Sequence, residues 1–151
     1  KELGVDTILN PAPAADIDKS IFHYIDYFTP NETEASFYVN HPVETHDDAS
    51  KAASTLLEMG IKNVIITLGE KGAYFANAKE TFSSPIANLS NPVVDTTGAG
   101  DAFNAGFAAA LTENQGIREA IAFASATAGL STTKIGTAKS MPSREEIDKI
   151  I

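Results

Sequence analysis

Two aspartates, two threonines and two glycines lie within the seven residues from Asp95 to Asp101. Glycine leaves the backbone accessible, and the amides at a helix start are unpaired and carry partial positive charge. Such amides suit a phosphate, or the charge that develops on a phosphoryl group during transfer. A carboxylate beside them, here Asp101, could take the proton of an attacking hydroxyl. The stretch therefore predicts a phosphoryl-transfer site with Asp101 as general base and the amides of Gly98, Ala99 and Gly100 as anion hole.

The same stretch is also compatible with other interpretations. An aspartate in a first helical turn is favoured by the helix dipole whatever its function, and glycines often only permit close packing. The sequence contains no G-x-x-x-x-G-K-[ST] motif, and the position three after Gly100 is Phe103, so G-x-G-x-x-G is absent as well. A nicotinamide-dependent dehydrogenase, which alternating strands and helices would also suit, is therefore disfavoured.

The elements that must position these residues alternate between strand-like and helix-like patterns. Short β-branched or apolar runs predict strands at residues 5–9, 24–29, 64–68, 73–76 and 81–84, and a further strand ending at Val94. Apolar spacing and cap residues predict helices that start at Pro30 with Thr29 as cap, cover 47–59, follow Asp101, follow Gly116 and start after Ser143. This alternation predicts an α/β fold with a largely parallel sheet and an antiparallel meander from 64 to 84.

Composition narrows the function classes. The chain has 151 residues, a net charge of −9 and no cysteine. The length fits one domain with a proper core, and the acidic balance disfavours nucleic acid, whose backbone needs Lys and Arg. Without cysteine there are no disulfides and no thiolate metal sites. No apolar run approaches the ~20 residues of a membrane span. The absence of cysteine fits a reducing environment, so we expect a cytoplasmic protein.

The stretch 95–106 resembles the C-terminal signature of the ribokinase family, the phosphofructokinase-B type of carbohydrate kinase. Segments 10–14, 29–35 and 67–72 agree with the family in order, so that the resemblance covers essentially the whole chain. It implies an α/β/α sandwich of three layers. It also implies transfer of the ATP γ-phosphoryl group to a sugar hydroxyl, with ribose as the expected sugar and fructose, nucleosides and sugar phosphates left open.

The resemblance also implies roles for residues beyond the glycine loop. It assigns nucleotide binding to Asn31, Thr67, Gly69, Lys71, Gly72, Gly100 and Ser125. It places Asn31 and Glu34 in a Mg²⁺ network through water, and a K⁺ site at Asp95, Thr97, Ser131, Lys134, Gly136 and Ser140. Each has a plainer alternative: Asn31 and Glu34 as a helix cap, 67–72 as a simple glycine turn, and Asp95 as a loop-forming Asx turn.

The resemblance places residues 1–151 in the C-terminal, nucleotide-binding part of one ribokinase-like domain. The N-terminal sugar-binding part and its lid, through which family dimers pair, have no counterpart in the sequence. We therefore expect this portion alone to bind ATP or ADP but to be inactive, because transfer needs both reactants held in line. A second function class stays open, a nucleotide-binding module without catalysis. Asp101→Asn separates the two, because only a kinase would lose turnover.

Overall fold

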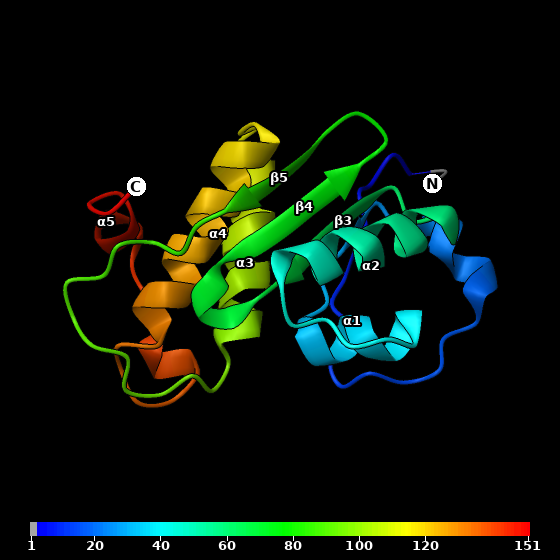
Figure 1. The fold of residues 1–151 in the computed structure, drawn as a ribbon. Coiled ribbons are helices and arrows are strands. Elements are labelled where there is room, and N and C mark those ends of the chain that lie inside the picture. Colours follow the sequence, from blue (N-terminus) through cyan, green and yellow to red (C-terminus); the bar gives the residue numbers. More distant parts are fainter. Residues whose placement is uncertain (1–2) are drawn as a thin grey trace. The chain divides into compact units, whose positions relative to one another are not determined.

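The computed structural model describes residues 3–151. They form two compact units, one up to Ser83 and the other Ser84–Ile151. The first unit carries most of the sheet, and the second is mainly helical (Figure 1). No helix in residues 3–151 has the length and apolar character needed to cross a membrane.

The sheet follows the order of its strands along the chain. Its neighbours are β1 (Ile8–Leu9), β2 (Tyr27–Phe28), β3 (Asn63–Thr67), β4 (Ala73–Asn77) and β5 (Thr81–Ser84). β1 pairs with β2 and β2 with β3 in parallel, whereas β3 and β4 are antiparallel. The predicted parallel sheet with an antiparallel meander is therefore confirmed, and residues 5–7, expected in the first strand, lie outside it.

Helices α1 (Glu32–Val39) and α2 (His46–Glu58) pack against the strands of the first unit (Figure 1). The predicted inner face of α2 is buried, with Ala49, Ala52, Ala53 and Leu56 fully inaccessible. Two 3₁₀ turns accompany them, η1 (Lys19–Tyr24) and η2 (Gly69–Lys71). The shared core that holds this unit together contains Phe22, Phe28, Val64, Ile66 and Leu68.

The strand predicted at 24–29 is shorter than expected. Tyr24 ends η1, a turn that Asp18 starts by accepting a hydrogen bond from the Ser20 amide. Tyr24 is 53% exposed and lies against the His23 ring, so this aromatic side chain does not pack in the core. The neighbouring Phe22 and Phe28 are fully buried.

The first helix begins later than predicted. Its N-cap is Asn31, not Thr29. Thr29 donates its amide to the Leu9 carbonyl, and the Pro30 carbonyl accepts from Thr67, so both residues continue the sheet. Asn31 also has the better capping side chain, because Glu34 three residues later completes a capping box.

In the second unit, α3 (Ala99–Thr112) and α4 (Ile117–Ser131) lie side by side (Figure 1). They are followed by η3 (Ala138–Ser140) and α5 (Arg144–Ile147), which Ser143 and Glu146 cap as predicted. The helices approach closely at Gly106, where an added Cβ would lie 2.6 Å from Thr127 Oγ1 and 3.1 Å from Ala124 Cα. The absence of a side chain at Gly106 thus permits the close packing of α3 on α4.

The strand predicted to end at Val94 is not formed. Val93 and Val94 are both 56% exposed and lie in irregular backbone. The amides of Val94 and Asp95 both donate to one carbonyl, that of Thr132, which fixes the segment without a ladder. β-Branched side chains favour a strand only where a neighbouring strand and a buried face accommodate them.

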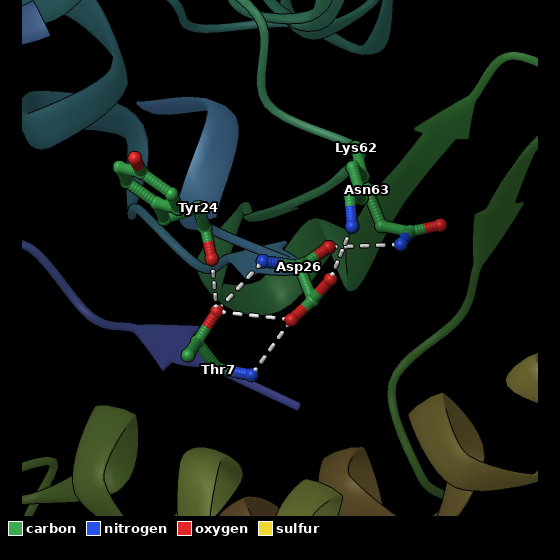
Figure 2. A network of polar contacts seen from close by, with 5 residues as sticks. All are labelled: Thr7, Tyr24, Asp26, Lys62 and Asn63. Carbon is green, nitrogen blue, oxygen red and sulfur yellow. Dashed lines mark hydrogen bonds and ion pairs between the residues drawn. The ribbon is translucent and has the colours of Figure 1, made fainter. Parts of the chain in front are cut away.

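A buried carboxylate joins the amino ends of the three parallel strands (Figure 2). Asp26, only 5% exposed, precedes β2. Its Oδ2 accepts from the amide and hydroxyl of Thr7 at 2.9 and 3.1 Å, and its Oδ1 pairs with Lys62 Nζ at 2.8 Å. Its carbonyl accepts from the Asn63 side chain at 2.8 Å. One residue therefore connects β1, β2 and β3, and nothing in the sequence singled it out.

Candidate nucleotide and phosphoryl-transfer site

The glycine loop leads directly into α3, as the sequence predicted. Gly98 caps the helix, and Asp101 lies exposed in its first turn. The Ala99 amide donates to the Thr96 carbonyl at 3.1 Å. Within residues 3–151, the amides of Gly98, Gly100 and Asp101 have no such partner. Of the predicted donors, the amides of Gly98 and Gly100 are therefore available, together with that of Asp101, whereas the Ala99 amide is engaged in the turn.

Gly98 is required by its backbone and by its surroundings. Its φ of 78° lies in the left-handed region, which side chains with a Cβ rarely adopt. A Cβ there would lie 3.0 Å from Thr137 Cγ2, so the loop 131–140 closely approaches the glycine loop. Thr137, which sequence reasoning missed, therefore helps to place the first turn of α3.

Asp95 connects the same two loops. Its Oδ1 accepts from the Thr97 amide at 2.9 Å, which forms the Asx turn expected as the alternative. Its Oδ2 accepts from the Gly136 amide, 41 residues away, at 3.0 Å. These amides, with Gly136 the stronger influence, lower the pKa of Asp95 to about 2. The ionised Asp95 carboxylate thus forms an Asx turn with one oxygen and a hydrogen bond between the two loops with the other.

Four further residues of the predicted K⁺ site, Ser131, Lys134, Gly136 and Ser140, lie between the end of α4 and the end of η3. Ser140 is fully buried and donates to the Thr137 carbonyl, and buried Ser131 donates to that of Ala128. The Lys134 ammonium turns away and pairs with Glu146 at 2.9 Å. That pairing is the main reason why the pKa of Glu146 falls to about 2. The ammonium that would repel a cation is therefore neutralised by a partner outside the loop.

In the first unit, three predicted residues meet at the end of β3. Asn31 Oδ1 accepts from the Glu34 amide at 2.9 Å, and Glu34 Oε2 accepts from the Asn31 amide at 2.8 Å. Asn31 also forms an isolated parallel bridge with Thr67. The capping interpretation is thus correct, and it holds Glu34, 7% exposed, beside the end of the strand.

The predicted nucleotide turn follows directly. Leu68 and Gly72 bond across it, and the Gly72 amide donates to Gly69. Gly69 and Lys71 are exposed, and Gly72 is buried. Lys71, which the resemblance assigns to nucleotide binding, donates from Nζ to the Glu44 carbonyl at 2.6 Å. The structure therefore gives this ammonium a protein partner.

Ser125 lies half-buried on α4, between the buried Ala124 and Ala126. Within the described part of the chain, no hydrogen bond joins it to the other predicted site residues. Its assignment to the nucleotide site stays a prediction.

The expected role of Asn31 and Glu34 towards Mg²⁺, through water, stays a prediction. Across residues 3–151 no group of three or more His, Cys, Asp or Glu side chains could hold a metal ion. Glu34 already accepts the Asn31 amide through Oε2. Mg²⁺ characteristically retains several waters and uses few carboxylates. The residues therefore fit a hydrated ion shared with a phosphate, and they do not fit an all-protein cage.

The family model described as "pfkB family carbohydrate kinase" matches residues 1–144. The chain is 42% identical to a ribokinase of Haemophilus influenzae over 146 residues, which are 97% of this chain and 47% of that protein. It is 37% identical to a deoxyribokinase of Salmonella typhi over 152 residues, covering 100% of this chain and 49% of that protein. The chain thus spans about half the length of the curated relatives it matches.

Solved structures agree with this assignment. The chain resembles Arabidopsis thaliana ribokinase complexed with ribose and ATP, with a TM-score of 0.93 and 36% identity over 99% of this chain and 48% of that one. For the ribokinase of Thermotoga maritima the TM-score is 0.86 and the identity 41%, over 97% of this chain and 48% of that one. The predicted ribokinase-like α/β fold is therefore confirmed.

Proposed function

Because this chain belongs to the pfkB family of carbohydrate kinases, we propose that it supplies the nucleotide-binding and catalytic-base portion of an ATP-dependent sugar kinase. The single observation that carries the proposal is the first turn of α3. There the exposed Asp101 stands beside the amides of Gly100 and Asp101, which have no other partner in residues 3–151. A base and an anion hole in one turn are what phosphoryl transfer requires.

In the proposed reaction, Asp101 accepts the proton of the sugar hydroxyl. The hydroxyl oxygen forms a bond to the γ-phosphorus of ATP, and the bond from that phosphorus to the bridging oxygen breaks. The electron pair leaves with ADP. Charge on the phosphoryl oxygens in the transition state is stabilised by the unpaired amides and by the positive end of the α3 dipole.

Two cations accompany the proposal. Mg²⁺, held through water near Asn31 and Glu34, would neutralise charge on the nucleotide phosphates. K⁺ would be coordinated by backbone carbonyl groups of the loop to which Asp95 is hydrogen-bonded. The residues proposed to form this site are Asp95, Thr97, Ser131, Lys134, Gly136 and Ser140. The hydrogen bond from the Gly136 amide to Asp95 supports this placement, because it holds the segment around Asp95 against the segment around Gly136. Equal activity in K⁺ and Na⁺ at matched ionic strength would remove the K⁺ part.

The substrate proposed is ribose, with deoxyribose as the nearest competitor. Support comes from the names of the relatives, a ribokinase and a deoxyribokinase, and from the Arabidopsis structure complexed with ribose and ATP. ATP as phosphoryl donor is supported by the same complex.

The deciding experiment measures ADP release from Mg-ATP by the full-length protein with ribose, deoxyribose, fructose and nucleosides, for the unsubstituted protein and for Asp101→Asn. Release that depends on a sugar should fall about 10²- to 10⁴-fold in the variant, the range expected for loss of a general base. If the protein binds nucleotide but releases no ADP with any of the sugars, the nucleotide-binding module without catalysis is favoured. No nucleotide binding at all would contradict the proposed function.

A further inference from the structure

The segment between α1 and α2 is attached to the start of α1. The Val43 amide donates to Ser36 Oγ at 2.9 Å, and Ser36 Oγ donates to the Glu32 carbonyl at 2.6 Å. The Val43 side chain is only 2% exposed. One hydroxyl thus connects the segment to the first turn of α1, the turn that Asn31 caps.

The next carbonyl along this segment holds the predicted nucleotide turn. Glu44 accepts from Lys71 Nζ at 2.6 Å across a separation of 27 residues. The bond is charge-assisted, and such bonds are shorter and stronger than those between neutral groups. Glu44 directly precedes Thr45, whose capping box with Asp48 fixes the start of α2. The ammonium is therefore attached to a well-ordered part of the backbone.

These contacts close a ring. The turn that contains Lys71 leaves β3 at Thr67, whose amide donates to the Pro30 carbonyl and which forms a bridge with Asn31. From Asn31 the chain enters α1 and leads back to Ser36. We call the set Glu32, Ser36, Val43, Glu44 and Lys71 the turn brace. The turn from Leu68 to Gly72 is thus held on one side by the end of β3 and on the other by the turn brace.

We infer that Lys71 and Ser36 are positioning residues for nucleotide binding, and that Lys71 acts through the Glu44 carbonyl instead of contacting a phosphate. The inference rests on the proposed function. A turn held in its binding geometry does not lose conformational freedom when the nucleotide arrives, so affinity rises without a new contact. Both residues act on the turn itself. Their loss should therefore weaken the binding of every nucleotide that contacts the turn by the same factor, whatever its number of phosphates.

The test compares Lys71→Met, Ser36→Ala and the double variant in the full-length protein. Lys79→Met, which removes a lysine from the exposed turn between β4 and β5, is the matched control. Calorimetry should show that either substitution weakens adenosine, ADP and ATP alike, by about tenfold, the scale of one lost hydrogen bond. The double variant should be scarcely weaker than Lys71→Met alone. The KM for ATP should rise while kcat changes little, and Lys71→Arg should restore most of the affinity.

The opposite pattern would overturn the inference. If Lys71 contacts a phosphate, its loss weakens ATP and ADP but leaves adenosine untouched, and Ser36→Ala has no effect on nucleotide affinity.

Amide hydrogen exchange without nucleotide separates this inference from the proposed function. Ser36→Ala should accelerate exchange at the remote amides of Lys71 and Gly72, and Lys71→Met should do so at Val43, whereas Lys79→Met should not. Unchanged exchange with intact nucleotide binding would refute the positioning role alone. Absence of nucleotide binding by the unsubstituted protein would refute the proposed function and the positioning role together.

Discussion

Asp95 is the residue whose ionisation can be followed most directly. Its two oxygens accept amides from Thr97 and Gly136, and the pKa of the carboxyl is lowered to about 2. An aspartate in an unfolded chain has a pKa of about 3.9. Because the folded pKa is the lower one, the stability that Asp95 contributes is present above about pH 4. It is lost as the pH falls towards 2.

We therefore predict that Asp95→Asn is less stable than the unsubstituted protein at neutral pH, and that the difference shrinks below pH 4 and vanishes near pH 2. Carboxyl ¹³C shifts should give the Asp95 midpoint, and urea unfolding at a series of pH values should give the difference in stability. A midpoint near 4 would contradict the two amide bonds. Lys134→Met leaves both bonds intact and is a suitable control.

Among the elements, the pair α3 and α4 depends on Gly106. An added methyl group would lie 2.6 Å from Thr127 Oγ1 and 2.8 Å from Thr127 Cβ. Thr127 is buried and donates to the Phe123 carbonyl, so it has little freedom to move. Gly106→Ala should therefore destabilise the chain by about 1–3 kcal/mol, the usual cost of overpacking.

Gly100→Ala is the matched control, because a Cβ at that helical glycine meets nothing within 4 Å. It should leave stability unchanged or raise it slightly, since alanine is the better helix former. Circular dichroism of the helices during unfolding would measure both variants. Equal midpoints for the two would show that the helices do not approach each other so closely.

The amino ends of β1, β2 and β3 depend on Asp26 (Figure 2). Asp26→Ala leaves the Thr7 amide without its carboxylate partner and should cost about 2–4 kcal/mol. Asp26→Asn keeps an oxygen for that amide and should cost less. Lys62→Met should cost under about 1 kcal/mol, because the Lys62 side chain is 51% exposed.

Tyrosine fluorescence can measure the stability of the first unit in each of these variants. The four tyrosines, Tyr24, Tyr27, Tyr38 and Tyr74, all precede Ser84 and therefore follow unfolding of the first unit. Urea midpoints in the order Lys62→Met, Asp26→Asn and Asp26→Ala, from high to low, are expected. A Lys62→Met variant as unstable as Asp26→Ala would show that the ion pair, and not the bonds to Thr7, stabilises this end of the sheet.

For the whole molecule, the features that could be predicted from sequence are local ones. The capping boxes at Asn31 and Ser143, the first-turn position of Asp101 and the inner face of α2 each depend on residues within a few positions of one another. The resemblance at residues 95–106 supplied the family. Caps, helix faces and the long motif can all be recognised in a single short stretch of sequence, because the residues that form them are close together along the chain.

The remaining features join residues that are far apart along the chain. Asp95 meets Gly136 across 41 residues, Lys71 meets Glu44 across 27 and Thr7 meets Asp26 across 19. In each case a backbone group is one partner, and backbone groups carry no residue signature. The strand predicted at Val93 and Val94 is absent for a related reason: their β-propensity is local, whereas a strand needs a partner, and no strand in residues 3–151 lies beside them.

The Asp26 network also bears on how such a sheet can change over evolutionary time. The hydrogen bonds of Asp26 hold the strands together where they begin, whereas the proposed nucleotide turn follows the point where β3 ends. Insertions, deletions and replacements in the turns after the strands can therefore accumulate without shifting one strand past another. Descendants of one ancestor can acquire new substrate preferences at one rim while inheriting the alignment of the strands from the other.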